Sequence, residues 1–364
     1  MNKRLKTRPI KIGKVSIGAN FPIAIQSMTK VDTCNIQKTV NEIRRLEKAG
    51  CEIIRVAVRD IKAARAINAI KKKIKIPLVA DIHFDYKLAL AALENGADKI
   101  RINPGNISKE SDLKEIIECA KKRKVPIRIG INSGSARLKS FPDRAIKLVS
   151  LARKYIKFFE RQNFRDIIIS LKSSSVRETV DAYRKLSKVC SYPLHLGVTS
   201  AGSLDTGIVK SSIGIGSLLL DGIGDTIRVS LTGDSVFEVI AAKRILQALK
   251  LRNFGPEVIS CPTCGRCQVD LLHTVKHLEA ALGRDYLLAT RTSSRFTLHA
   301  SRFTRPITIA VMGCEVNGPG EAKDADLGVA FGKDSGVLFK KGQVVKKVKS
   351  KDAAKELMRL LKEI

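Results

Sequence analysis

Short apolar runs alternate with amphipathic segments from about residue 22 to residue 249. The runs are rich in isoleucine and valine, which favours strands, and segments such as residues 35–50 repeat apolar residues at helical spacing. Eight runs predict strands: residues 22–29, 51–58, 76–84, 98–104, 125–132, 164–172, 193–199 and 225–231. Eight strand-then-helix units predict a (β/α)8 TIM barrel of class α/β, with an open doubly wound sheet as the alternative.

Polar side chains recur on one face of these predicted strands. In residues 98–104, Ile100 and Ile102 share one face and Arg101 and Asn103 the other, because side chains alternate along a strand. On other predicted strands, three further arginines and a serine likewise lie on the face opposite the apolar residues: Arg55, Arg128, Arg228 and Ser230. If the apolar faces meet the helices, these side chains point into the barrel, together with Asp81, His83 and Lys172.

Cations that converge on a barrel mouth require a counter-charge, because a buried guanidinium or ammonium group is unfavourable unless it is paired. The guanidinium fork matches phosphate oxygens in a bidentate geometry. The pattern therefore predicts a diphosphate or polyphosphate ligand. The alternative is that the arginines lie at strand edges, where they face solvent or pair with local carboxylates.

The strand and helix alternation stops near residues 251–260, where Gly255 and Pro256 interrupt it. We expect a barrel domain over residues 1–253 and a second domain over residues 254–364. The second domain is predicted to hold a helix at 269–282, strands at 307–314 and 326–332, and a closing helix at 351–364.

Four cysteines of the second domain form a metal-ligand pattern. Cys261, Cys264 and Cys267 are three residues apart, and Cys314 follows at the end of a predicted strand. A C-x-x-C spacing suits zinc, an iron–sulfur cluster or a redox dithiol, and His273 and His277 could complete a zinc site. The other four cysteines stand singly and are expected to be buried thiols: Cys34, Cys51, Cys119 and Cys190.

A carboxylate follows Cys314 after a glycine-rich turn, at Glu321. A carboxylate is a harder donor than a thiolate, so an iron that it holds exchanges its ligand more readily. Glu321 is therefore a candidate cluster ligand whose displacement would open a substrate position. The alternative is a carboxylate that stabilises the start of a helix.

The net charge of +32 raises nucleic acid, anionic membranes and acidic proteins as partners. The chain has no tryptophan and few tyrosines, which is unfavourable for base stacking, and no apolar run is long enough to span a membrane. We expect neither nucleic acid nor a membrane as partner, and lysine-rich solvated helix faces instead. A cytoplasmic, reducing location is expected, where clustered cysteines bind metal rather than form disulfides.

Eight segments, in this order, carry a family resemblance: QSMT, LVADIHFDY, IRINPGNI, PIRIGINSGS, PLHLGVT, DGIGDTIRVSL, SCPTCGR and VMGCEVNGPGEA. They resemble the bacterial 4-hydroxy-3-methylbut-2-en-1-yl diphosphate synthases of the methylerythritol phosphate route to isoprenoids, over nearly the whole chain. The resemblance implies reductive ring opening and dehydration of 2-C-methyl-D-erythritol 2,4-cyclodiphosphate to 4-hydroxy-3-methylbut-2-enyl diphosphate. It also implies flavodoxin or ferredoxin as electron donor, and a homodimer in which one subunit's cluster domain closes over its partner's barrel.

The resemblance also implies roles for individual residues. A 4Fe-4S cluster would be held by Cys261, Cys264, Cys314 and Glu321, which leaves Cys267 spare. The matching substrate-binding positions are Arg55, His83, Arg101, Asn103, Arg128, Lys172, Arg228 and Ser230. The expected catalytic residues are Asp81, Asn317 and Glu321.

Three positions depart from the family pattern. Ser200 stands in TSAG where the family has TEAG, Ser175 replaces an aspartate, and Glu315 replaces an apolar residue. A serine hydroxyl is far less acidic than a carboxylic acid, so Ser200 cannot protonate a departing oxygen as the family glutamate would. We expect Asp81 or a bound water to substitute. The alternatives are a catalytically impaired relative of the synthases and, from another class, a zinc-ribbon nucleic-acid-binding protein.

Overall fold

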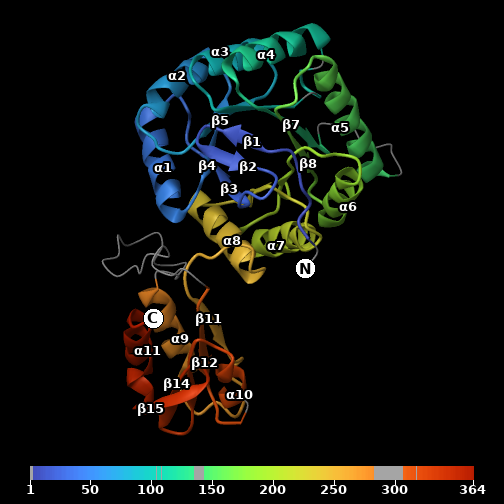
Figure 1. Ribbon diagram of the computed structural model, residues 1–364. Helices are drawn as coiled ribbons and strands as arrows, with labels where there is room; N and C mark the ends of the chain where they lie inside the picture. Colours follow the sequence, from blue (N-terminus) through green and yellow to red (C-terminus); the bar gives the residue numbers. More distant parts are fainter. Residues whose placement is uncertain (1–2, 104, 108, 135–142, 283–305, 317) are drawn as a thin grey trace. The chain divides into compact units, whose positions relative to one another are not determined.

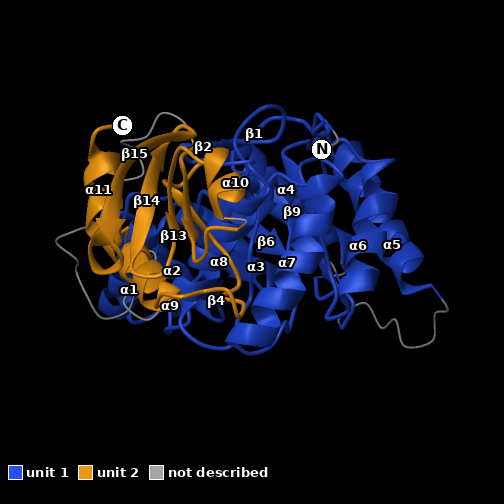
Figure 2. Cartoon of the chain, turned by 90° about the horizontal axis from the view of Figure 1, so that it is seen from below, with its two compact units in different colours: residues 1–252 blue, residues 253–364 orange. Residues whose placement is uncertain are grey.

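The computed structural model describes residues 3–103, 105–107, 109–134, 143–282, 306–316 and 318–364. The chain forms two compact units, residues 1–252 and residues 253–364, which Figure 2 shows in different colours. The division lies one residue before the boundary expected from the sequence.

The first unit is a parallel (β/α)8 barrel, which confirms the predicted fold class. All eight predicted runs form strands, in the order β8-β7-β6-β5-β4-β3-β10-β9. A bridge between Ile169 and Leu194 joins the outer strands of this order, β8 and β9. The strands are β3 (Ala24–Met28), β4 (Ile53–Val58), β5 (Leu78–Ile82), β6 (Lys99–Ile102), β7 (Ile127–Asn132), β8 (Ile167–Lys172), β9 (His195–Leu196) and β10 (Thr226–Ile227).

Eight helices form a ring around these strands (Figure 1). They are α1 (Ile36–Ala49), α2 (Ile61–Lys71), α3 (Tyr86–Glu94), α4 (Glu110–Arg123), α5 (Arg144–Arg161), α6 (Val176–Ser187), α7 (Leu204–Leu220) and α8 (Ser235–Ala248). Aspartates start four of them and accept a backbone N–H there, which satisfies donors that a helix start leaves unpaired. These N-caps are Asp60, Asp85, Asp143 and Asp234.

A short antiparallel hairpin that the sequence did not predict closes one end of the barrel. It consists of β1 (Ile10–Ile12) and β2 (Val15–Ile17). Its isoleucines pack on the amino-terminal parts of the barrel strands, against Ala24, Ile53 and Val79. The carboxyl ends of the strands are therefore the end at which a ligand can enter. The basic residues between the isoleucines hid this hairpin from the pattern of apolar runs.

The second unit is a five-stranded sheet with the order β11-β12-β13-β14-β15. Its strands are β11 (Glu257–Ser260), β12 (Thr308–Met312), β13 (Leu327–Phe331), β14 (Ser335–Lys340) and β15 (Gln343–Lys349). Its helices are α9 (Leu271–Ala281), α10 (Gly318–Lys323) and α11 (Ala353–Lys362), with a 3₁₀ turn at Ser350–Asp352. The core packs α9 and α11 against the sheet through Leu278, Val329 and Leu357.

The sequence predicted α9, β12, β13 and α11 but missed three strands. β11 follows the Gly-Pro interruption and is partly exposed, and β15 is an exposed edge strand whose lysines mask its pattern. In the part of the chain that the structure describes, no helix has the length and apolar character needed to cross a membrane.

Candidate functional site

Charged side chains line the barrel interior, as the alternation along the strands predicted. Arg55, Asp81, Arg101 and Arg128 lie on four consecutive strands, β4 to β7, and their exposed fractions are 8%, 3%, 7% and 1%. The strand register pairs Asp81 with Arg101 and Arg101 with Arg128, so these side chains are direct neighbours. The alternative of arginines that face solvent is therefore wrong for these positions, whereas its other part, pairing with a local carboxylate, holds for Arg55 and Arg101.

Asp81 is the carboxylate at the centre of this group. Its Oδ1 accepts a hydrogen bond from Arg101 Nη1 at 3.1 Å, and its Oδ2 lies 3.7 Å from Arg55 Nε and 3.8 Å from His83 Nε2. Burial opposes its ionisation, but Arg55, Arg101 and Arg128 outweigh burial and lower the pKa of Asp81 to about 2. Asp81 is therefore an anion near neutral pH and holds the neighbouring cations in place.

Cations in the interior nevertheless exceed the described anions that could neutralise them. Lys99 and Lys172 join the arginines; Lys99 Nζ donates to Gln26 Oε1 at 3.2 Å, and Lys172 Nζ lies 3.4 Å from His195 Nε2. Burial, and then the neighbouring cations, lower the pKa of Lys99, Arg128 and Lys172. The same causes lower the pKa of Arg55 to about 9 despite Asp81. An anion placed among these groups would relieve their mutual repulsion.

Several guanidinium nitrogens in this group are buried and have no hydrogen-bond partner among the described residues. They are Arg101 Nε, Arg128 Nε and Nη1, and Arg228 Nε. A buried donor without an acceptor is unfavourable, so this set is arranged for a ligand with several acceptor oxygens. The charge and the geometry both favour a phosphate-bearing ligand.

Glycines on neighbouring strands make room for these cations. A Cβ at Gly130 would lie 2.6 Å from Arg101 Nε, and a Cβ at Gly197 would lie 2.6 Å from Lys172 Nζ. Any larger residue at either position would displace a cation from the interior. The sequence contains both glycines within strand runs, but the alternation alone did not indicate this purpose.

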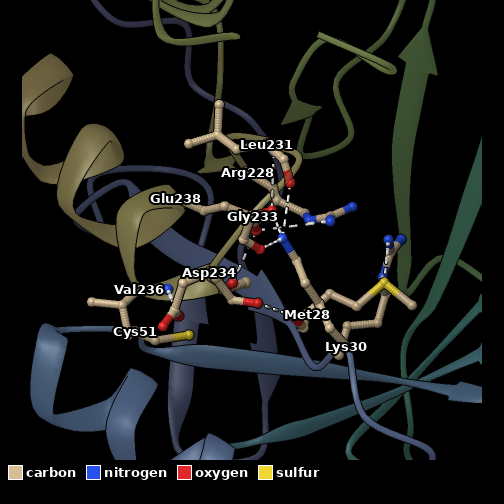
Figure 3. A network of polar contacts seen from close by, with 12 residues as sticks. Met28, Lys30, Cys51, Arg228, Leu231, Gly233, Asp234, Val236 and Glu238 are labelled. Carbon is tan, nitrogen blue, oxygen red and sulfur yellow. Dashed lines mark hydrogen bonds and ion pairs between the residues drawn. The ribbon is translucent and has the colours of Figure 1, made fainter. Parts of the chain in front are cut away.

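A buried carboxylate on α8 fixes Arg228 and the end of β10 (Figure 3). Glu238 is 1% exposed; its Oε1 accepts the Leu231 N–H at 3.1 Å and its Oε2 the Ser27 hydroxyl at 3.2 Å. Lys30 Nζ lies 3.4 Å and Arg228 Nη2 3.8 Å from its oxygens. Sequence reasoning missed Glu238, and the only available signal was a lone glutamate on the apolar face of a predicted helix.

The remaining predicted barrel residues also lie at the carboxyl ends of strands. Asn103 is buried and its Oδ1 accepts the Gly105 N–H at 3.1 Å, whereas His83 and Ser230 are partly exposed. The strand pattern missed two interior residues, Lys99 and His195; the His195 ring Nδ1 lies 2.7 Å from Thr226 Oγ1. Both lie at strand positions whose side chains point into the barrel, so stricter use of the alternation would have predicted them.

The cysteines of the second unit gather at the carboxyl ends of two paired parallel strands. Ser260 pairs with Val311, so Cys261 and the segment that leads to Cys314 leave the same edge of the sheet. The Gly313 N–H donates to Cys261 Sγ at 3.2 Å. Cys264 is exposed, Cys314 partly buried, and Glu321 lies exposed in α10. Asn317 lies outside the described residues.

The candidate donors are three cysteine thiols and one carboxylate, a set that suits zinc or an iron–sulfur cluster. Among the described residues, no three His, Cys, Asp or Glu side chains lie close enough to hold one metal ion. His273 and His277 stack on each other on α9 with centroids 6.3 Å apart, and both are exposed. An iron–sulfur cluster takes soft thiolate donors, each at a separate corner, and the segments that carry Cys261 and Cys314 leave the same edge of the sheet.

Cys267 is partly buried and packs against the core of the second unit, as Cys261 also does. Its thiol donates to the Val269 carbonyl at 3.3 Å, and a Cβ at Gly313 would lie 2.5 Å from its Sγ. It is therefore the natural control for the other cysteines. Of the four single cysteines, Cys51 is buried as expected, but the prediction is wrong for Cys34, which is exposed. The last two are partly buried: Cys119 and Cys190.

The positions that depart from the family pattern are at the surface. Ser175 caps α6 by accepting the Glu178 N–H at 3.2 Å, a role that serine and aspartate share. Ser200 is exposed, with a left-handed backbone at φ 52°, and Glu315 is exposed after β12. Ser175 therefore preserves a local structural role, whereas Ser200 cannot itself supply the acidity of a carboxyl group.

Comparisons with known proteins match both units. The family model of the GcpE TIM-barrel domain matches residues 7–243, and that of the GcpE protein C-terminal domain matches residues 257–363. Two relatives are named 4-hydroxy-3-methylbut-2-en-1-yl diphosphate synthase (flavodoxin). The one from Caldanaerobacter subterraneus subsp. tengcongensis is 52% identical over 362 residues, which cover 98% of this chain and 96% of the relative. The one from Fusobacterium nucleatum subsp. nucleatum is 49% identical over 361 residues, which cover 98% of this chain and 97% of the relative.

Among solved structures, the dihydropteroate synthase from Stenotrophomonas maltophilia is similar in fold, with a TM-score of 0.53. The two sequences are 14% identical, and the matched region covers 67% of this chain and 98% of the dihydropteroate synthase chain. At this identity the similarity concerns the barrel fold alone.

Replacement of Asp81 by Asn is expected to destabilise the protein by about 3 kcal/mol at pH 7, since it leaves buried cations without their anion. The pKa of Asp81 is about 2 in the folded protein against an ordinary 3.8, so the unfolded chain binds more protons between these values. The stability that Asp81 contributes is therefore complete above pH 4 and is lost as the pH falls towards 2. Urea denaturation of the wild-type protein and the Asp81→Asn variant between pH 6 and pH 3 should show that the difference between their free energies of unfolding becomes smaller below pH 4. A difference that stays constant would contradict this assignment.

Proposed function

Since the chain belongs to the GcpE family, we propose that its barrel cations hold a cyclic diphosphate and that its C-terminal cysteines hold a 4Fe-4S cluster. The reaction is the reductive ring opening and dehydration of 2-C-methyl-D-erythritol 2,4-cyclodiphosphate to 4-hydroxy-3-methylbut-2-enyl diphosphate. The chain is thus an iron–sulfur oxidoreductase enzyme. Flavodoxin, which the relatives' name includes, is its electron donor, and the alternative of a zinc-ribbon nucleic-acid-binding protein has no support.

The observation that carries the substrate assignment is the set of buried guanidinium donors without acceptors among the described residues. Arg101, Arg128 and Arg228 would donate to phosphate oxygens, and Lys172 would add an ammonium donor. Arg55 lies against Asp81 and Met28, where its Nε and Nη2 donate to the Met28 sulfur at 3.1 and 2.9 Å. His83, Asn103 and Ser230 lie at the same strand ends and would contact the rest of the substrate. A substrate held at both phosphates can adopt one orientation, which lowers the entropic part of the barrier.

The cluster assignment rests on the soft donors of one sheet edge. Cys261, Cys264 and Cys314 would bind three corners, and Glu321 the fourth. When bound, the cluster would supply electrons one at a time and a Lewis-acidic iron at the carboxylate corner. Glu321 suits that corner because its exchange leaves a position for a substrate oxygen. We include Asn317 as a catalytic residue because it lies between Cys314 and Glu321 in the sequence.

Two buried carboxylates, Asp81 on β5 and Glu238 on α8, position cations rather than transfer protons. Asp81 holds Arg101 and Arg55, and its low pKa leaves it without a proton near neutral pH. Glu238 holds Arg228 and Lys30. The hairpin β1–β2 closes the opposite end of the barrel, which limits access of water to the charged interior from that side.

We propose that the enzyme is a homodimer in which the cluster domain of one subunit serves its partner's barrel. The cations and the cysteines belong to separate compact units, residues 1–252 and 253–364, and the reaction needs both groups at one substrate. A symmetric dimer would form two such composite sites.

Replacement of Cys261 by Ala is expected to abolish the brown colour, the bound iron and sulfide, and turnover after anaerobic purification. Replacement of Cys267 by Ala is the matched control, because that thiol lies in the same segment but donates a hydrogen bond to the Val269 carbonyl and is spare in the proposed ligand set. It should keep the cluster and the activity. The measurements are metal and sulfide analysis, the visible spectrum, and turnover of the cyclic diphosphate with reduced flavodoxin. Equal cluster loss in both variants would contradict the ligand assignment, and a colourless zinc-loaded wild-type protein would contradict the function.

A mixture of two inactive variants tests the composite site. Arg128→Ala removes a barrel donor and Cys261→Ala removes a cluster ligand, so each homodimer should be inactive. Subunit exchange between them should restore about a quarter of the wild-type activity, because half of the dimers contain one intact composite site of two. Persistent inactivity in a mixture that mass analysis shows to contain heterodimers would mean that each subunit uses its own cluster.

A further inference from the structure

The reaction needs a proton at a defined place. The substrate dianion takes up two electrons and one proton and gives the product trianion and water, so the proton goes to the departing hydroxyl. Near the barrel mouth, Asp60, Asp85, Asp143 and Asp234 accept backbone N–H bonds as helix caps. Asp81 and Glu238 are engaged with cations. These six carboxylates are therefore poorly placed to deliver the proton.

Glu178, in the first turn of α6, is bonded differently. Its Oε2 accepts a hydrogen bond from the Ser173 hydroxyl at 3.0 Å, and no lysine or arginine among the described residues forms an ion pair with it. Its Oε1 is buried and has no hydrogen-bond partner in the described part of the chain. This oxygen is engaged by no cation and no backbone N–H among the described residues, and a carboxyl oxygen can hold and pass on a proton.

A path of hydroxyl groups connects this carboxyl to the barrel mouth. Ser173 follows Lys172 at the end of β8, and the Ser133 hydroxyl, at the end of β7, donates to Ser173 Oγ at 3.2 Å. The Thr199 N–H donates to the Ser173 carbonyl at 3.1 Å, which brings the segment next to Ser200 alongside. Hydroxyl groups both donate and accept, so Ser173 can pass a proton from Glu178 towards the mouth.

We propose that Glu178 is the proton source for the departing hydroxyl and acts through Ser173. This inference rests on the proposed function. In this step a proton leaves the Glu178 carboxyl, a proton from the Ser173 hydroxyl chain reaches the departing oxygen, and the carbon–oxygen bond breaks as water forms. The electrons come from reduced flavodoxin, and solvent reprotonates Glu178. In this way Glu178, on α6, provides the carboxyl group that is missing at Ser200.

Replacement of Glu178 by Gln is expected to lower kcat about 100-fold, the low end of the usual contribution of a positioned acid. The iron content and the Kd for the cyclic diphosphate should stay at their wild-type values, because the change keeps size and hydrogen bonding. Replacement of Asp205 by Asn is the control: this exposed carboxylate lies in the first turn of the next helix, α7, and its loss should leave kcat unchanged.

Addition of Ser200→Glu to the Glu178→Gln variant separates a proton-transfer role from a structural one. A carboxyl at position 200 should restore most of kcat, since it offers a proton at the same mouth, but it cannot repair a packing defect at Glu178. Wild-type turnover in the single variant, or a low kcat that Ser200→Glu does not raise, would overturn this inference alone. A cluster-loaded wild-type protein without turnover would instead refute the proposed function, and this inference with it.

Discussion

Burial of several like charges inside one barrel is the constraint on which this structure depends. Arg55, Arg101, Arg128 and Lys172 are nearly inaccessible to solvent, and Asp81 is the carboxylate that touches Arg55 and Arg101 directly. Such an arrangement is unfavourable without further negative charge. The fold therefore favours an anionic ligand among these groups, and burial, followed by the repulsion between the cations, lowers their pKa values.

The rest of the barrel maintains that arrangement. Strand register sets the arginines side by side, Gly130 leaves space for the Arg101 guanidinium, and Glu238 holds Arg228 from a helix outside the barrel. The hairpin β1–β2 packs apolar side chains at the opposite end, so the polar interior is reached from the carboxyl ends of the strands.

Local periodicity accounts for the features that were predictable from the sequence. Alternation placed Arg55, Arg101 and Arg128 inside because one face of each strand is apolar, and spacing singled out the cysteines. Periodicity could not predict Glu238, because its contact with Ser27 joins a helix to a strand end distant in sequence. It could not predict Glu178 either, because the contact with Ser173 depends on how the chain turns between β8 and α6. The hairpin and β15 were missed for another reason: lysines on their exposed faces interrupt the apolar pattern.

The most direct test of the buried-cation account is calorimetric titration of the cyclic diphosphate into the wild-type protein and an Arg128→Met variant. Arg177→Met serves as control, because Arg177 is 93% exposed on α6 and lies outside the barrel interior. Loss of charge-assisted hydrogen bonds from a buried guanidinium should weaken binding about 100-fold or more, while the control binds like wild type. Equal affinity of wild type and Arg128→Met would contradict the account, since it would mean that the phosphates bind elsewhere.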